Sequence, residues 1–197
     1  MLSRARAAGR WAGLLSAAVT VTIMMGATPA NATVAEGWVA GIGVITDDWG
    51  DEGTLSSNHF RNSGATQLWQ WVLFADGAIE SNGTPYDVAD IDCDFGPNTT
   101  YATKDWQRSQ GLSADGLVGP LTFGKADNKL VEIPLFFNPR AWNVKYVGKA
   151  HTVYLYRELD QGYWPKGYFV PDGAVFSSNN TYWGADNLLA EYFDGSC

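Results

Sequence analysis

The most restrictive feature of this sequence is an eight-residue phrase that occurs twice. It reads DCDFGPNT at residues 92–99 and DGLVGPLT at residues 115–122. A repeat constrains the fold, because similar local sequences build similar local structures. In each copy Asp begins a turn, Gly gives the backbone freedom, and Pro suits the first turn of a helix. We therefore predict two equivalent loops, each of which buries an apolar anchor, Phe95 or Val118, and starts a helix.

The residues around these loops predict three helices. After the first copy, apolar residues recur at helical spacing over Thr99–Trp106, until Gly111 ends the run. After the second copy, Thr122–Leu130 predicts a shorter helix. Before both copies, Thr66–Phe74 predicts another, which Gly77 ends. Three helices joined by two equivalent loops make a compact bundle.

These residues resemble the bacterial peptidoglycan-binding domain, a helical module found beside cell-wall hydrolases. The likeness covers about residues 64–130, through LWQWVLFADG and DCDFGPNTTYATKDWQRSQGLSADGLVGPLTFG. Trp69-Gln70 matches a Leu-Gln pair of the family, Trp106-Gln107 a Phe-Gln pair, and Gly111-Leu112 its Gly-Leu. The sequence departs from the family at one point, because the Gly expected after Asp92 is replaced within IDCD. The replacement puts the usual turn of the first loop in doubt and points to a disulfide there.

The resemblance implies recognition of cell-wall glycan or its peptide stems without chemistry. Helical spacing predicts that Trp69, Leu73, Phe95, Ala102, Trp106, Leu112 and Val118 form the core. The same spacing points other side chains outward, and we predict that they contact the ligand together with two loop carboxylates: Trp71, Tyr86, Tyr101, Arg108, Asp92 and Asp115. Aromatic faces stack on sugar rings, and carboxylates accept hydroxyl or amide hydrogens. The alternative role for the two Asp residues is turn capping.

The N-terminal residues predict an export signal. Three arginines precede the apolar stretch Trp11–Ala27, and Ala30-Asn31-Ala32 is a typical cleavage site. The stretch is interrupted by polar residues and is shorter than the roughly 20 residues that a membrane-spanning helix needs. We therefore expect residues 1–32 to be a signal peptide and the protein to be secreted, extracellular or associated with the cell wall.

The net charge excludes some classes of partner, and the two cysteines allow a disulfide. Removal of residues 1–32 leaves 10 basic residues against 21 acidic ones, a net charge of −11. Such a surface opposes nucleic acid and anionic membranes, so we expect neither as a partner. We also expect no cofactor and a monomer. Cys93 and Cys197 are the two cysteines of the chain. An oxidising exterior allows them to pair, which would tie the C-terminus to the first loop.

An acidic cluster precedes the helical region. Asp47, Asp48, Asp51 and Glu52 surround Trp49. We interpret the cluster as a solvated turn, because acidic runs are usually exposed. The alternatives are a calcium loop or a pair of carboxylates for glycoside hydrolysis. The spacing lacks the alternate-position ligands of a calcium loop.

The residues after Leu130 predict a small antiparallel β module. They are rich in aromatic and β-branched residues, Thr152–Arg157 alternates as a strand does, and Gly148 and Asp172-Gly173 predict turns. Aromatic residues such as Tyr154 and Trp183 are able to line a glycan surface, but in so small a module most aromatics must be core. The fold class is therefore α+β, a three-helix peptidoglycan-binding-like bundle followed by a small antiparallel β module.

We expect four segments: the signal peptide at 1–32, an extension at 33–63, the helical domain at 64–131 and the β module at 134–197. Neither His59 nor His151 lies in a metal-binding spacing, and no nucleophile motif is present. The sequence therefore predicts a secreted, non-catalytic peptidoglycan-binding protein. The alternative is a small wall hydrolase with its site in the acidic cluster or the β module. A third interpretation is a glycan or protein adaptor on a relic helical scaffold.

Overall fold

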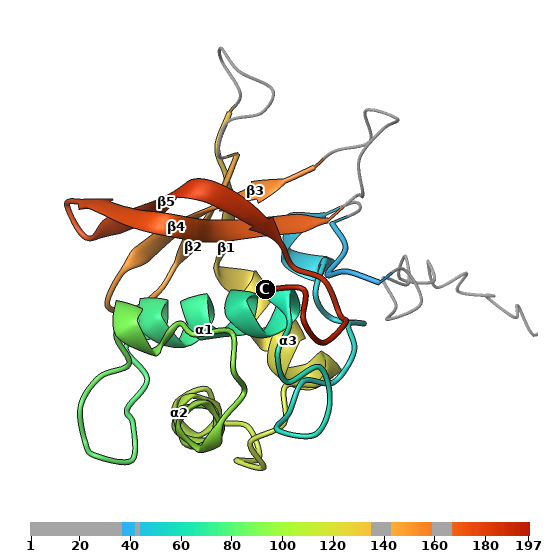
Figure 1. The fold of residues 1–197 in the computed structure, drawn as a ribbon, viewed down its shortest axis with the longest axis vertical. Coiled ribbons are helices and arrows are strands. Elements are labelled where there is room, and N and C mark those ends of the chain that lie inside the picture. The colour runs from blue at the N-terminus through green and yellow to red at the C-terminus, as the bar shows by residue number, and fades with distance from the viewer. Residues whose placement is uncertain (1–36, 42–43, 135–142, 159–166) are drawn as a thin grey trace, which may run out of the picture.

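The computed structural model of the protein describes residues 37–41, 44–134, 143–158 and 167–197, so the predicted signal peptide lies outside the described residues. Figure 1 shows three layers. A β-sheet covers one side of helix α1 (Gly64–Asp76), and helix α2 (Pro97–Ser109) lies on the other side. Helix α3 (Pro120–Ala126) lies beside them and continues into the 3-10 helix η4 (Asp127–Lys129).

The three predicted helices are confirmed, and their ends follow local chemistry. The Ser63 hydroxyl caps the start of α1 by accepting from the Thr66 N–H at 3.1 Å. Gly77 ends this helix in the left-handed conformation, with φ of 63°. Pro97 and Pro120 stand at the first turns of α2 and α3, as the repeated phrase predicts. Two further 3-10 helices are η2 (Ile45–Asp47) and η3 (Val88–Asp90).

The described strands form one sheet of five, in the order β1-β2-β3-β4-β5. Their bounds are β1 Leu130–Glu132, β2 Val144–Val147, β3 Thr152–Arg157, β4 Tyr168–Ser178 and β5 Thr181–Leu189. Neighbours pair antiparallel, and the start of β5 also pairs parallel with β3. The predicted α+β class is thereby confirmed. The sheet begins at Leu130, the last residue of the third predicted helix.

The predicted turn at Asp172-Gly173 is wrong. These residues lie inside β4, where the pairing with β5 shifts register between Asp172 and Val175, and Gly173 has φ of 65°. An extra residue in one strand makes a bulge, and a left-handed glycine suits it. The chain instead turns at Asn179-Asn180, with φ of 50° and 58°. Two consecutive residues of positive φ make the type I′ turn that matches strand twist.

Helix α1 is the centre of the molecule, since all 13 of its residues are buried. Its first residue contacts the end of β5, and its last turn contacts the chain that follows β2. A Cβ atom on Gly64 would lie 2.1 Å from the Leu189 carbonyl oxygen, and one on Gly148 would lie 2.1 Å from the Ala75 carbonyl oxygen. Only glycine permits such backbone contacts. Helices and sheet consequently share one hydrophobic cluster, while the predicted domain boundaries stay a prediction.

The Asp76 carboxylate joins the three layers at the end of α1. It accepts from Trp106 Nε1 of α2 at 2.5 Å and from the Tyr146 hydroxyl of β2 at 2.8 Å. It also accepts from the Lys149 N–H at 2.9 Å and pairs with Lys129 Nζ at 2.7 Å. A buried carboxylate with several donors and a cation is well stabilised, whereas its partners would be left unsatisfied without it.

We expect Asp76→Ala to lower the free energy of unfolding by about 3–5 kcal/mol, because it leaves two buried donors unsatisfied and the partly buried Lys129 without its anion. Urea denaturation measures this loss. The control is Asp105→Asn, at a partly exposed carboxylate that pairs with Arg108 at 3.6 Å and that, as Asn, keeps an acceptor for the Ile79 N–H. Exposed pairs contribute about 1 kcal/mol or less. Similar losses in the two variants would contradict a central role for Asp76.

Candidate functional site

The two copies of the repeated phrase fold into the same clamp around a glutamine of the preceding helix. In the first clamp, Gln70 Nε2 of α1 donates to Asp92 Oδ1 at 2.7 Å, to the Asp94 carbonyl at 3.1 Å and to the Thr99 hydroxyl at 3.3 Å. Gln70 Oε1 accepts from the Cys93 N–H at 2.8 Å. The glutamine amide thus mimics a backbone partner for the loop.

The second clamp repeats these contacts position by position. Gln107 Nε2 of α2 donates to Asp115 Oδ1 at 2.8 Å, to the Leu117 carbonyl at 2.9 Å and to the Thr122 hydroxyl at 3.1 Å. Gln107 Oε1 accepts from the Gly116 N–H at 2.9 Å. The repeated phrase therefore exists because each helix is locked to the next by one buried glutamine.

The first loop keeps the turn that its sequence put in doubt. Cys93 occupies the place of Gly116, and both residues have positive φ, 63° and 80°. A left-handed conformation is costly for a residue with a side chain. Cys93 is joined to Cys197 by the predicted disulfide, with Cα atoms 6.2 Å apart. The cysteine replaces the glycine without changing the clamp, and the disulfide is added to the turn.

The predicted contact residues Tyr101 and Arg108 lie on the exposed side of α2. The Tyr101 side chain is 42% exposed. Arg108 follows seven residues later, which is two helical turns and hence the same side of the helix. Asp92 and Asp115 lie at the two loops, where each Oδ1 atom is already used by its clamp and by an N–H of its own loop. This arrangement accounts for them as turn-capping residues.

The predicted outward orientation of Trp71 and Tyr86 is wrong. Both side chains are 2% exposed. Trp71 Nε1 donates to the Pro171 carbonyl of β4 at 3.1 Å, and the Tyr86 hydroxyl donates to the Asp90 carbonyl at 2.8 Å. For Trp71 the reason is that α1 is covered by α2 on one side and by the sheet on the other. Tyr86 lies beyond α1, and its hydroxyl also meets the Thr99 hydroxyl of α2 at 3.1 Å. A helix that is apolar all round, as LWQWVLFA is, signals burial of every face.

Trp71 nevertheless borders a small cavity of about 160 Å³ between α1 and β4. Gln67, Val88, Ile91 and Asp172 also line it. Among the described residues, the buried Gln67 Oε1 atom has no hydrogen-bond partner, while its Nε2 donates to the Pro171 carbonyl at 3.3 Å. The cavity has room for water or one small polar group and not for a sugar chain.

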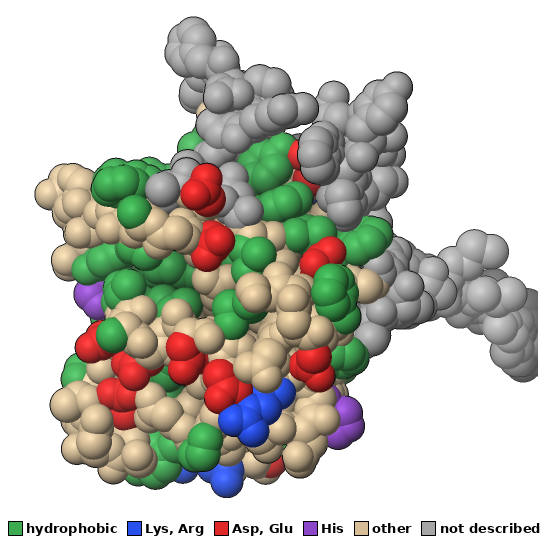
Figure 2. Space-filling model, in the orientation of Figure 1, with side chains coloured by type: hydrophobic (Ala, Val, Ile, Leu, Met, Phe, Trp, Pro, Cys, Tyr) green, Lys and Arg blue, Asp and Glu red, His purple; other side chains and the backbone are tan. Residues whose placement is uncertain are grey.

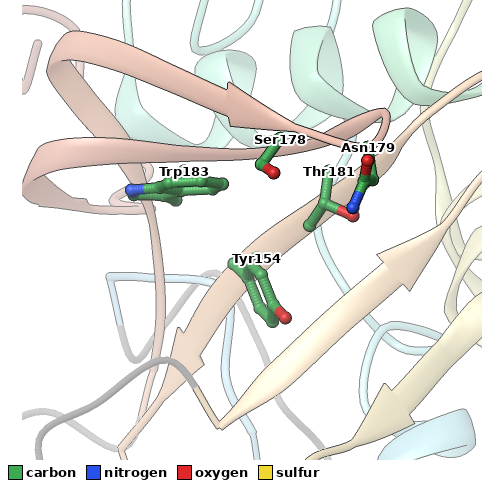
Figure 3. Close-up of a pocket in the computed structure, with 5 residues that line it drawn as sticks. All are labelled: Tyr154, Ser178, Asn179, Thr181 and Trp183. Carbon is green, nitrogen blue, oxygen red and sulfur yellow. The ribbon is translucent and has the colours of Figure 1, made fainter.

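A larger hollow of about 520 Å³ opens beside strands β3, β4 and β5. Its lining residues are Tyr154, Ser178, Asn179, Thr181 and Trp183, which Figure 3 shows around one space. The composition of the β module indicated that Tyr154 and Trp183 are able to line a glycan surface, but not that they meet. Their proximity depends on the register of three strands, which periodicity alone does not reveal.

The acidic cluster is not a solvated turn, so that prediction is wrong for two of its residues. Asp48 and Glu52 are buried. Asp48 pairs with Arg157 at 2.8 Å and accepts from the Tyr168 hydroxyl at 2.5 Å, and Glu52 accepts from the Tyr192 hydroxyl at 2.7 Å. The cause is Trp49, which is fully buried among aromatic rings and carries its neighbours inward.

Two of the buried acids have raised pKa values, as the general acid of a hydrolase has, whereas its partner carboxylate stays ionised. Desolvation raises the pKa of Asp48 to about 6 and that of Asp127 to about 7. Both carboxylates are committed to internal contacts, however, since Asp48 binds Arg157 and Asp127 accepts from the Trp49 N–H at 3.1 Å. Neither residue lines the two cavities described above. We therefore assign both carboxylates to the core.

The described residues offer neither a metal site nor a membrane-spanning helix. These residues contain no group of three His, Cys, Asp or Glu side chains that could hold a metal ion. Across the same part of the chain, every helix is too short or too polar to cross a bilayer. Figure 2 shows acidic side chains spread over the visible face, with few basic ones among them.

We expect the free-energy cost of the left-handed backbone at Cys93 to be measurable once the disulfide is removed. The double variants Cys93→Gly/Cys197→Ser and Cys93→Ser/Cys197→Ser both lack the bridge. Glycine adopts positive φ without strain, so the first variant should be more stable by about 1 kcal/mol. Denaturant midpoints compare them. Greater stability of the serine form would contradict the equivalence of Cys93 and Gly116.

We also expect Asp127 to make stability depend on pH. Its pKa is raised to about 7 from 3.8, so between these values the folded protein binds the proton more tightly than the unfolded chain does. The resulting stability is present below about pH 4 and is lost as pH rises through about 7. Asp127→Asn should flatten this decline by an amount on the order of 2 kcal/mol. Urea denaturation from pH 4 to 7 measures it, and parallel curves would refute the assignment.

Comparisons with known proteins bear on the clamped region. Residues 82–125 match the family model described as "Putative peptidoglycan binding domain". An uncharacterised protein in the bpoA1 3′ region of Kitasatospora aureofaciens is 46% identical over 46 residues, which are 23% of this chain and 39% of that protein. No solved structure matches. The match spans both loops and α2, and it confirms that this part of the chain is similar to the peptidoglycan-binding domain indicated by its repeated phrase.

Proposed function

We propose that the protein is a secreted, non-catalytic protein that binds peptidoglycan of the bacterial cell wall. The observation that carries this proposal is the family match over residues 82–125, the segment that the two glutamine clamps hold in place. The rigid clamps fix α2 relative to both loops. A surface held in this way binds without losing conformational entropy, which favours recognition.

The exposed side of α2 is the contact surface that we propose. Tyr101 offers an aromatic face to a sugar ring, and the Arg108 guanidinium offers paired donors to a carboxylate of the wall peptides. Asp92 and Asp115 act by fixing the loops at the two ends of this surface. Trp71 and Tyr86 are buried, so they support binding through the packing of α1 and the first loop.

Export is supported by two independent features. Residues 1–32 have the composition of a signal peptide, and the Cys93–Cys197 disulfide suits an oxidising exterior. A wall-bound protein meets its ligand only outside the membrane. The signal, the disulfide and the family match therefore favour the same compartment.

The runner-up function is a small wall hydrolase, and the raised pKa values of Asp48 and Asp127 are the observation that favours it. Burial and internal pairing of both groups weigh against it. Enzyme and binder differ in one observable, because only an enzyme reduces the turbidity of a wall suspension.

The test is co-sedimentation of residues 33–197 with purified peptidoglycan sacculi, with turbidity followed in the same tube. We expect the protein in the pellet and constant turbidity. Tyr101→Ala and Arg108→Ala should each weaken binding roughly tenfold, equivalent to about 1.4 kcal/mol. The matched controls are Phe193→Ala and Lys125→Ala, which remove exposed side chains outside the proposed surface.

Each outcome of this test decides a part of the proposal. Falling turbidity would replace the binder with the hydrolase, and absence of the wild type from the pellet would refute wall binding. Equal losses in the α2 variants and their controls would remove Tyr101 and Arg108 from the contact surface.

A further inference from the structure

We propose that the hollow on the sheet is a second binding site, and that its ligand is an uncharged glycan of β-1,4-linked N-acetylated sugars. The lining residues are those shown in Figure 3, which we call the sheet hollow: Tyr154, Ser178, Asn179, Thr181 and Trp183. The identification of cell-wall glycan as the natural source rests on the proposed function. The sheet hollow itself stands on its own geometry.

The sheet hollow lies on the side of the sheet that faces away from α1. Tyr182 packs inward, with its ring 4.8 Å from that of Phe74 in α1. Successive side chains of a strand point to opposite faces, so Trp183 points outward. The same alternation applies in β3, where Val153 is fully buried and Tyr154 is partly exposed. The proposed surface on α2 and the sheet hollow are therefore separated by α1 and the sheet (Figure 1).

Two aromatic rings, those of Tyr154 and Trp183, line one wall of this site, and the ring of Phe176 packs beside Trp183. Trp183 lies 6.4 Å from Tyr154 at an interplanar angle of 68°, and 6.4 Å from Phe176 at 28°. Phe176 and Trp183 are direct cross-strand partners in β4 and β5, and such pairs hold each other in place. The indole is thus supported by packing while the hollow stays open. A supported ring of this kind offers a flat face to the apolar side of a sugar ring.

Polar groups without charge line the remainder. Ser178, Asn179 and Thr181 contribute two hydroxyls and an amide beside the type I′ turn, whose two residues of positive φ fix the hairpin. Within the described residues these side-chain groups make no hydrogen bond to one another or to other residues. They remain able to donate to and accept from the hydroxyl and acetamido groups of a sugar.

The described lining of the sheet hollow is uncharged, and this favours one class of ligand. The chain has a net charge of −8, yet none of the five lining residues is ionised at neutral pH. An anionic ligand would find no cation among these five residues, although Lys145 of β2 stands opposite Tyr154. A wholly apolar ligand would cover two hydroxyls and an amide without replacing their hydrogen bonds to water. A neutral, polyhydroxylated ligand with apolar ring faces suits both parts of the lining. Its ring faces pack on the aromatic side chains, and its hydroxyls bond to the polar ones.

The size of the site agrees with a short glycan segment. Its volume of about 520 Å³ falls within the range of about 300–1,000 Å³ typical of ligand sites. The 160 Å³ cavity beside Trp71 is several times smaller and lacks an exposed aromatic platform. Of these two cavities, the sheet hollow is the one whose size and lining suit a saccharide.

The test is calorimetric titration of residues 33–197 with chitotetraose, the soluble β-1,4-linked tetramer of N-acetylglucosamine. We expect saturable binding at one site, a loss of at least tenfold in affinity for Trp183→Ala and Tyr154→Ala, and near wild-type affinity for Trp183→Tyr, which keeps an aromatic face. Thr181→Val, which removes a hydroxyl at constant shape, should weaken binding about threefold. Phe193→Ala and Lys125→Ala are controls at exposed side chains outside the sheet hollow and should bind normally.

The outcomes separate this proposal from wall binding in general. No binding of chitotetraose by the wild type, or unchanged affinity in both Trp183→Ala and Trp183→Tyr, would overturn the saccharide site. Equal losses in Trp183→Ala and Tyr101→Ala would also overturn it, because they would place the sugar on α2. If sacculus binding is lost in Tyr101→Ala but kept in Trp183→Ala, the proposed function stands. Chitotetraose binding then decides separately whether the sheet hollow is a saccharide site.

Discussion

The carboxylate of Asp76 is the interaction on which the arrangement of layers depends. It stands at the last turn of α1, and its donors come from α2, from β2 and from the chain after β2, with Lys129 as the cation. A single buried anion therefore fixes how far the sheet and α2 stand from opposite sides of the same helix. Packing alone tolerates sliding of apolar faces, whereas a hydrogen-bonded ion with several donors permits one position.

The two glutamine clamps extend this order to the rest of the helical part. Gln70 links α1 to the first loop, and Gln107 links α2 to the second, with the same donors and acceptors in both. Each loop then starts the next helix at a Gly-Pro pair. In both loops a glutamine side chain thus supplies the hydrogen bonds that the loop backbone would otherwise lack. The two loops give rigid support to the exposed side of α2.

Much of the fold could be predicted because its signals are local. The Pro and Gly residues at helix ends and the alternation over Thr152–Arg157 act within a few residues, and α2, α3 and β3 follow from them. Predictions failed where partners are distant in sequence. The burial of Asp48 depends on Arg157 and Tyr168, more than 100 residues away. Helical periodicity predicted the wrong orientation for Trp71, because α1 is covered from two sides. The predicted ligand contacts of the site residues stay a prediction.

The contacts at the two ends of α1 have a consequence for the order of folding. The N–H of Ala65 donates to the Glu191 carbonyl, and the Gly64 N–H donates to the Ser196 hydroxyl, so the first turn of this helix is completed by residues near the end of the chain. Contacts that span most of a sequence slow folding, because long loops must close before the contacts form. Helix α1 therefore reaches its final stability only after the residues that follow β5 are in place, and a partly synthesised chain would carry the clamped segment without its central helix secured.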